Sequence, residues 1–181
     1  LILITAVTMF FLAGADLLQM AIVGLFMGTI GYALAMQISY AGSRLASYLE
    51  SIADLTKASY HVQQAVIAFL NGGLTGVGLG ESRQKFGFLP APHTDSIFAV
   101  LAEELGLLGC ILVATLFVVL AIRGYRIARA APDSFGALLG AGITTWIAFE
   151  ALLNIAVMTA VLPFSGVPLP FISYGGSALV T

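Results

Sequence analysis

Charged residues are scarce in this sequence: Asp, Glu, Lys and Arg together make up 9% of its 181 residues. A soluble domain carries about a quarter of such residues to cover its surface. The nine acids and seven bases are spread thinly and give a net charge of −2, so the chain has neither a basic stripe nor an acidic tail. These shortages argue against a soluble domain and exclude nucleic acid as the leading partner.

Cysteine pairs and nucleotide-binding patterns are also missing. Cys110, the only cysteine, lies in an apolar run and can form neither an internal disulfide nor a Cys-x-x-Cys metal or redox pair. The glycines at positions 73, 76, 78 and 80 fit neither the G-x-G-x-x-G fingerprint nor the G-x-x-x-x-G-K-[ST] loop, and no predicted strand precedes them. On pattern alone, this glycine run is interpreted as a flexible surface turn.

Apolar residues are abundant instead. They make up 60% of the sequence, and the mean hydropathy is +1.03. A membrane-spanning helix needs about 20 apolar residues to cross a hydrocarbon core of about 30 Å. Such runs cover residues 1–14, 17–40, 97–122 and 136–162, and a further helix is predicted to begin at Phe171. We therefore predict an all-α, polytopic transmembrane helical bundle that forms a single membrane domain over residues 1–181. Because both ends lie in apolar runs, we expect the chain to be part of a longer fold.

The distribution of arginine predicts the orientation in the membrane. Arg123, Arg126 and Arg129 lie between two predicted spans, and short loops rich in Arg and Lys remain cytoplasmic. Counting spans from this loop predicts that residues 41–95 form a long extracytoplasmic loop. The same count places the proline-rich turn at residues 162–170 on the outer side.

Apolar residues at helical spacing indicate that the outer loop is ordered. They predict an interfacial helix over residues 45–55 and a second helix that ends at Asn71-Gly72-Gly73. The turn at residues 162–170, with the small residues that follow it, fits either a broken helix that lines a cavity or a plain connector.

Asp95 lies where the predicted outer loop enters a span, close to Pro90 and Pro92. An aspartate at a helix start commonly caps free N–H groups, and the helix dipole favours its charge. The same placement keeps the carboxylate ionised at the membrane surface, where it could take a proton from a hydroxyl group. His93 could orient this carboxylate or bind a phosphate, although a loop histidine is more often only solvated.

Other charged residues are candidates for substrate contact. Glu103 and Glu104 lie about two turns inside a predicted span, and Glu150 lies in the middle of the next. Charges at such depth are costly and usually face a partner, a cavity or the bundle interior, although a helix-packing role is equally compatible for Glu150. Arg83 and Lys85 are spaced to flank a diphosphate, but a solvated loop pair is the commoner case.

Four blocks of the sequence, taken in order, are similar to the signatures of one family. They are Gly76-Val-Gly-Leu-Gly-Glu-Ser-Arg-Gln-Lys85, Leu89-Pro-Ala-Pro-His-Thr-Asp-Ser-Ile-Phe-Ala-Val100, Glu103-Glu-Leu-Gly-Leu-Leu-Gly109 and Val167-Pro-Leu-Pro-Phe-Ile-Ser-Tyr-Gly-Gly-Ser177. Together they resemble the SEDS proteins (shape, elongation, division and sporulation), which include FtsW, RodA and SpoVE. Residues 84–90 and 152–163 are more similar to the division-type FtsW and SpoVE. The sequence departs from the family pattern at Ala91 and Ser96, where glutamate and phenylalanine are usual.

The resemblance implies the C-terminal half of a ten-span protein of the bacterial cytoplasmic membrane, which polymerises peptidoglycan glycan strands from lipid II at the outer face. It places the family's proposed catalytic base on Asp95 and other family signatures on Lys85, His93, Glu103, Glu104 and Asn154. Arg83 and Arg44 are weaker candidates, beside Lys85, for holding the diphosphate. No metal site is expected among the residues, although a divalent cation could share this work.

The resemblance also implies partners. These are the growing glycan strand, membrane lipids and a class B penicillin-binding protein, which is a transpeptidase. A lipid-linked-precursor flippase and a non-catalytic scaffold stay open as alternatives, because an intramembrane glutamate and a proline-broken helix also suit a transporter.

Overall fold

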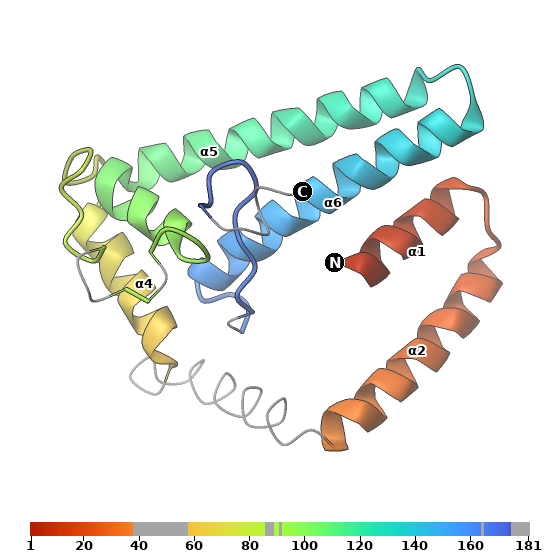
Figure 1. Ribbon diagram of the computed structural model, residues 1–181, viewed down its shortest axis with the longest axis horizontal. Helices are drawn as coiled ribbons and strands as arrows, with labels where there is room; N and C mark the ends of the chain where they lie inside the picture. Colours follow the sequence, from red (N-terminus) through yellow and green to blue (C-terminus); the bar gives the residue numbers. More distant parts are fainter. Residues whose placement is uncertain (38–57, 86–88, 91, 164, 175–181) are drawn as a thin grey trace. The chain divides into compact units, whose positions relative to one another are not determined.

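The computed structural model describes residues 1–37, 58–85, 89–90, 92–163 and 165–174. These residues form α-helices joined by turns and contain no strand (Figure 1). Arg44 and the interfacial helix predicted over residues 45–55 lie outside the described residues. The helical class predicted from the sequence is therefore confirmed for the part of the chain that the structure describes.

The chain divides into two compact units, which are described separately here. Unit 1 comprises Leu1–Ala46 and Val119–Phe149, and unit 2 comprises Ser47–Val118 and Glu150–Thr181. The longest helix, α5 (Ile97–Arg129), and the helix that follows it, α6 (Ser134–Met158), each contribute residues to both units.

Unit 1 contains α1 (Ile2–Leu12) and α2 (Leu17–Gln37), joined by a short turn. Its parts of α5 and α6 approach each other closely: the phenol oxygen of Tyr125 lies 2.8 Å from the Thr145 hydroxyl. A side chain at Gly124 would collide with Thr144, so a small residue is needed where the helices meet.

The apolar runs fold as predicted, with three differences at the helix ends. α5 continues past residue 122 to Arg129, and α6 ends at Met158 rather than at residue 162. The helix predicted to begin at Phe171 is not formed through Tyr174, because this segment is a turn followed by irregular backbone. α5 and α6 are long and apolar enough to cross a membrane.

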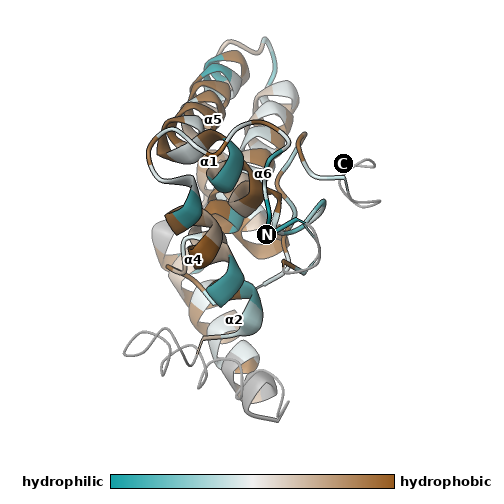
Figure 2. Cartoon of the chain, turned by 90° about the vertical axis from the view of Figure 1, so that its left-hand side faces the viewer, coloured by the Kyte–Doolittle hydropathy of each residue, from teal (hydrophilic) through white to brown (hydrophobic). Residues whose placement is uncertain are grey.

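The exposed side chains of α5 are strongly apolar. Large apolar residues such as Leu108, Leu112 and Leu116 are each at least 60% exposed, and Figure 2 shows much of this helix in the hydrophobic colour. In water such an apolar surface would promote aggregation, whereas contact with the hydrocarbon of a membrane would remove it from water.

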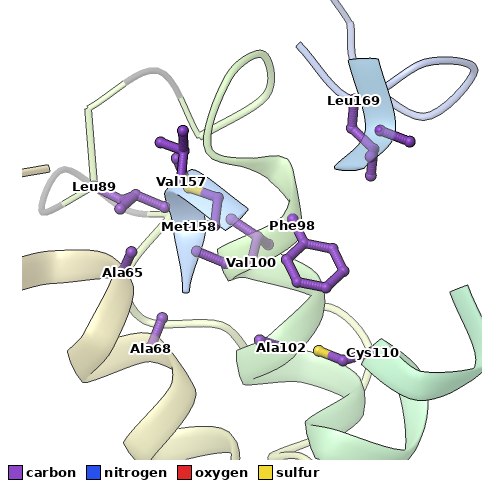
Figure 3. Packing of buried hydrophobic residues seen from close by; sticks show 12 residues of the cluster. Ala65, Ala68, Leu89, Phe98, Val100, Ala102, Cys110, Val157, Met158 and Leu169 are labelled. Carbon is purple, nitrogen blue, oxygen red and sulfur yellow. The ribbon is translucent and has the colours of Figure 1, made fainter. Parts of the chain in front are cut away.

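Unit 2 has its core between α4 (Tyr60–Gly72), the first turns of α5 and the end of α6 (Figure 3). Small residues of α4, Ala65 and Ala68, are fully buried. The rings of Phe69 and Phe98 lie 6.0 Å apart between their centroids. α4 ends where the sequence predicted, because Gly73 takes a positive φ of 54° that most residues avoid.

Candidate functional site

The glycine run is a packed segment that enters a break in α5. At Gly106 the backbone of α5 is not helical, with φ 67° and ψ −167°. In a continuous helix, the N–H groups of Leu107 and Leu108 would bind the carbonyl oxygens of Glu103 and Glu104. The break separates these donors and acceptors, so each needs another partner.

Backbone groups of the loop supply those partners. The N–H groups of Leu107 and Leu108 donate to the carbonyl oxygens of Gly73 (2.9 Å) and Leu74 (3.2 Å). The carbonyl oxygens of Glu103 and Glu104 accept from the N–H groups of Val77 (3.0 Å) and Gly78 (3.1 Å). These four backbone groups are therefore satisfied by one short segment. The run lies at the surface, as the sequence-based interpretation expected, but its backbone is bound to α5 rather than being a free turn.

Two glycines make this close approach possible. A Cβ at Gly76 would lie 2.1 Å from the Glu104 carbonyl oxygen, and a Cβ at Gly106 would lie 2.4 Å from the Gly76 nitrogen. Both residues also have a positive φ. Only glycine allows two backbones to pack at this distance.

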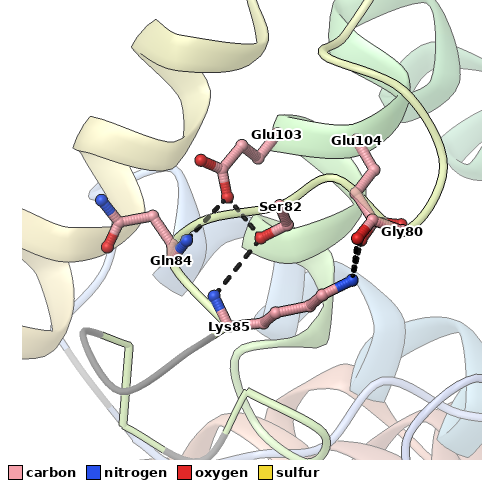
Figure 4. Close-up of polar contacts among 6 residues, drawn as sticks. All are labelled: Gly80, Ser82, Gln84, Lys85, Glu103 and Glu104. Atoms are coloured by element: carbon pink, nitrogen blue, oxygen red, sulfur yellow. Dashed lines mark hydrogen bonds and ion pairs between the residues drawn. The ribbon is translucent and has the colours of Figure 1, made fainter.

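The Glu103 carboxylate joins the following loop to α5 (Figure 4). Glu103 is 1% exposed and accepts hydrogen bonds from the Ser82 hydroxyl, the Gln84 N–H (3.2 Å) and the Asn71 amide (3.4 Å). A buried carboxylate is tolerated when several donors satisfy it. The structure thus places this predicted substrate-binding residue in a buried network that fixes the loop at residues 82–84.

Lys85 and Glu104 form an ion pair beside this network. The Lys85 Nζ lies 2.9 Å from Glu104 Oε1 and also donates to the Gly80 carbonyl oxygen at 2.7 Å. Both side chains are mostly buried, at 19% and 13% exposure. The structure therefore brings Lys85, Glu103 and Glu104 together at the loop, while Arg83 is exposed to solvent.

Asp95 belongs to a second group of contacts, at the start of α5. The helix begins at Ile97, and Ser96 is the residue whose carbonyl accepts its first bonds, from Ala99 and Val100. Ser96, not Asp95, therefore holds the capping position that the sequence suggested for the aspartate. The Ser96 hydroxyl turns back to the Pro90 carbonyl oxygen at 3.0 Å, which closes the loop before the helix.

Three successive carbonyl oxygens before α5 are bound by donors from the C-terminal part of the chain. The His93 oxygen accepts from the Tyr174 N–H at 2.7 Å, and the Thr94 oxygen accepts from the Ser173 hydroxyl at 2.6 Å. The Asp95 oxygen accepts from the Asn154 amide at 2.8 Å. The backbone that carries Asp95 is thus fixed residue by residue.

The Asp95 carboxylate faces a glycine of the proline-rich turn. A Cβ at Gly166 would lie 3.2 Å from Asp95 Oδ2, and Gly166 has a positive φ of 61°. The glycine therefore lies close against the carboxylate, and a side chain there would crowd Oδ2. Asp95 is half-buried and His93 is exposed, so this end of α5 combines a fixed acid with an accessible loop.

The helix start also favours a negative charge. N–H groups in the first turn of a helix lack intrahelical partners, and the helix dipole places partial positive charge there. Asp95 lies two residues before this turn, whereas Glu103 lies about 9 Å further along the helix from Ile97 at 1.5 Å per residue. The helix start is therefore a favourable position for an acidic side chain.

Several residues of this arrangement were missed by the sequence reasoning. Asn154 was assigned only as a family signature, and Ser82, Gly166 and Ser173 had no individual role. One signal was available for Asn154, because a polar side chain within an apolar span usually has a specific partner. Which partner it binds depends on contacts 59 residues away, and no local pattern shows that. Among the described residues, no three His, Cys, Asp or Glu side chains are grouped so as to hold a metal ion.

Comparison with known proteins places this geometry in a family. The model of the FtsW/RodA/SpoVE family, described as cell cycle protein, matches residues 1–181. The chain belongs to this family. The resemblance seen in the four sequence blocks is therefore confirmed over the whole chain.

Similar proteins with curated names support the same family assignment. The chain is 44% identical over 176 residues to Stage V sporulation protein E of Bacillus subtilis, covering 97% of this chain and 48% of that protein. It is 46% identical over 149 residues to a protein of Geobacter metallireducens named "Probable peptidoglycan glycosyltransferase FtsW", covering 82% of this chain and 40% of that protein. The chain spans about half the length of the curated relatives it matches.

A solved structure supports the fold. In a study of the structural coordination of polymerization and crosslinking by a peptidoglycan synthase complex, one chain matches with a TM-score of 0.62 and 26% sequence identity. The match covers 90% of this chain and 45% of that chain. The helical arrangement therefore has a counterpart in a peptidoglycan synthase.

Proposed function

We propose that the protein to which this chain belongs polymerises peptidoglycan glycan strands from lipid II at the outer face of the bacterial cytoplasmic membrane. The observation that carries the proposal is Asp95: its backbone is fixed at the start of an apolar helix long enough to cross a membrane, and its half-buried carboxylate lies close to Gly166 of the proline-rich turn. Relatives named peptidoglycan glycosyltransferase support the reaction class. We further propose a multi-pass membrane fold and a transpeptidase partner, a class B penicillin-binding protein. The matching chain comes from a synthase complex that coordinates polymerization and crosslinking, which is compatible with such a partner.

The proposed reaction is a single inverting displacement. The donor sugar carries an α-linked diphosphate and the product bond is β. Asp95 takes the proton of the acceptor's 4-hydroxyl. At the same time the oxygen of that hydroxyl bonds to the donor's anomeric carbon, and the bond from this carbon to the diphosphate oxygen breaks. The leaving group departs as an anion, so it needs cations rather than a carboxylic acid.

The cationic groups come from the outer loop. We assign the diphosphate to Lys85, with Arg83 and Arg44 as additional candidates and His93 at the entrance to the site. In the structure Lys85 is paired with Glu104, so a diphosphate would compete with that carboxylate for the ammonium group. Glu103 holds the loop rather than the substrate, since its Oε2 already accepts hydrogen bonds from the Ser82 hydroxyl and the Gln84 N–H.

The direct test replaces the proposed base. Asp95→Asn in the full-length protein should lower the polymerisation rate on purified lipid II by at least about 100-fold, because general-base catalysis contributes about 10²–10⁴. Lipid II binding should stay within about twofold of wild type. Asp133→Asn is the matched control, because Asp133 accepts a bond from the Gly136 N–H at the start of α6, a bond that asparagine can also accept. Glycan polymer from Asp95→Asn at the wild-type rate would remove Asp95 from the mechanism.

A lipid-linked-precursor flippase is the second candidate, because transporters use broken membrane helices and α5 is broken at Gly106. In transporters the freed carbonyl oxygens bind ions, whereas here the loop occupies the oxygens of Glu103 and Glu104. Reconstituted vesicles separate the two: polymer made from externally added lipid II identifies the polymerase, and lipid movement without polymer identifies the flippase. A scaffold would tolerate changes at both Asp95 and Lys85.

A further inference from the structure

Asn154 bridges the two segments that surround the Asp95 carboxylate. Its amide nitrogen donates to the Asp95 carbonyl oxygen at 2.8 Å and to the Val167 carbonyl oxygen at 2.6 Å. A primary amide carries two N–H groups, so both donors of the side chain are used. One buried group thus joins the loop before α5 to the turn at residues 162–170.

The orientation of this amide is set by its two acceptors. Asn154 is 1% exposed, and its Oδ1 accepts no hydrogen bond from the described residues. Turning the amide over would place an oxygen against two carbonyl oxygens, which repel it. The side chain is therefore held by donation alone, and an aspartate in its place could not make these bonds.

The bridge controls the spacing beside the carboxylate. Val167 follows Gly166, which lies close against Asp95: a Cβ at Gly166 would be 3.2 Å from Asp95 Oδ2. Because Asn154 binds the backbone of Asp95 and of Val167 at the same nitrogen, it fixes the distance between the acid and the turn opposite it. Ser173 adds a second bond to the same backbone through the Thr94 oxygen.

From these contacts we propose that Asn154 is a positioning residue for Asp95, which holds the backbone of the acid against the turn at residues 165–170. The inference rests on the proposed polymerase function. Asn154 does not touch the sugar; it fixes the direction from which the carboxylate meets the acceptor hydroxyl. Ser173 supports the same backbone and has a smaller share of the effect.

The test compares variants of the full-length protein on purified lipid II. Asn154→Asp has nearly the same shape but replaces the donor by an oxygen. We expect kcat to fall roughly 10- to 100-fold, since a displacement of about 1 Å can cost a hundredfold, and KM for lipid II to stay within about twofold. Ser173→Ala, which buries no new charge, should lower kcat several-fold with KM again unchanged. Thr159→Val is the control, because the exposed Thr159 hydroxyl, one residue past α6, bonds the carbonyl oxygens of Ile155 and Ala156 within α6, and the change should leave both constants unchanged.

Three outcomes would overturn the inference. The first is a wild-type kcat in Asn154→Asp. The second is a rise in KM of Asn154→Asp with kcat unchanged, which would indicate lost binding rather than lost positioning. If Asn154→Asp does not fold, Ser173→Ala decides, and a wild-type kcat in Ser173→Ala is the third.

Asp95→Asn is measured in parallel. If it is inactive while Asn154→Asp and Ser173→Ala are fully active, the positioning role fails and the proposed base stands. If Asp95→Asn is active, the proposed function itself fails.

Discussion

The buried Glu103 carboxylate stabilises the loop beside it by accepting hydrogen bonds. Its oxygens accept from a hydroxyl and from backbone and side-chain nitrogens of the loop. Removing the acceptor leaves those donors buried without partners, and each such group costs about 1–3 kcal/mol. The loop at residues 82–84 should therefore depend on this one side chain.

We expect Glu103→Leu to lower the free energy of unfolding by about 2–4 kcal/mol, and Glu103→Gln, which keeps an acceptor oxygen, to lower it by less. Denaturant titration in detergent micelles measures both values. Glu81→Ala, at an exposed position of the same loop, should stay within about 0.5 kcal/mol of wild type. Equal stability of Glu103→Leu and wild type would show that the network contributes little.

Variants of the Lys85–Glu104 ion pair distinguish a contribution to stability from a contribution to substrate binding. A double-mutant cycle with Lys85→Met and Glu104→Gln should give a coupling of about 0.5–3 kcal/mol in unfolding free energy. If Lys85 also holds the diphosphate, Lys85→Met raises KM for lipid II, whereas Glu104→Gln, which releases the ammonium group, leaves KM unchanged or lowers it. An equal rise in KM for both variants would assign the pair a purely structural role.

At the scale of elements, the unexpected feature is the broken helix with a loop threaded into the break. α5 remains compatible with a membrane because the N–H groups of Leu107 and Leu108, and the carbonyl oxygens of Glu103 and Glu104, bind the loop at residues 73–78. The break at Gly106 kinks α5. The first turns of the helix, which carry Glu103 and Glu104, lie against the loop.

Gly76→Ala should disrupt this arrangement. The new methyl group would lie 2.1 Å from the Glu104 carbonyl oxygen, and the residue would keep an unfavourable positive φ. Gly80→Ala is a matched control, because Gly80 also has a positive φ, of 83°, but nothing lies within 4 Å of its Cβ position. We expect Gly80→Ala to cost about 1–2 kcal/mol from backbone strain alone and Gly76→Ala to cost clearly more. Thermal unfolding of the two variants side by side measures the difference, and equal melting temperatures would contradict the close packing.

The elements themselves were predictable from the sequence, whereas the ties between them were not. Apolar runs identified α1, α2, α5 and α6, and the Asn71-Gly72-Gly73 stop identified the end of α4. The break in α5 was missed, because a glycine within an apolar run is tolerated in a continuous helix. What decides the conformation is the loop backbone that arrives there, and local residue patterns do not specify that contact.

The site divides in the same way. Asp95, Lys85, Glu103 and Glu104 could be selected from residue type, depth in a span and resemblance. The pairing of Lys85 with Glu104, and the binding of the Asp95 backbone by Asn154, depend on segments 19 and 59 residues apart. Such contacts follow from the tertiary fold and carry no short-range signal in the sequence.

At the scale of the whole molecule, the distribution of arginine predicts which side of the membrane each end of α5 faces. Arg123, Arg126 and Arg129 are exposed at the C-terminal end of this helix, and such clusters remain cytoplasmic. The start of α5, with Asp95, would then face outward. This orientation is required if the substrate is polymerised outside the cell.

Cysteine labelling tests the orientation in intact cells. In a cysteine-free background of the full-length protein, a membrane-impermeant maleimide should label Glu81→Cys but should label Asp133→Cys only after the membrane is permeabilised. Both positions are exposed in the structure, so accessibility alone does not distinguish them. The reverse labelling pattern would place the Asp95 end inside the cell and would exclude the proposed reaction.

The most direct measurement is a structure of the full-length protein with a lipid II acceptor and a non-reactive donor analogue bound. The proposed mechanism predicts that the acceptor's 4-hydroxyl lies within hydrogen-bond distance of the Asp95 carboxylate, about 2.6–3.2 Å. An acceptor hydroxyl that binds a different base, with Asp95 pointing away from the sugar, would contradict it.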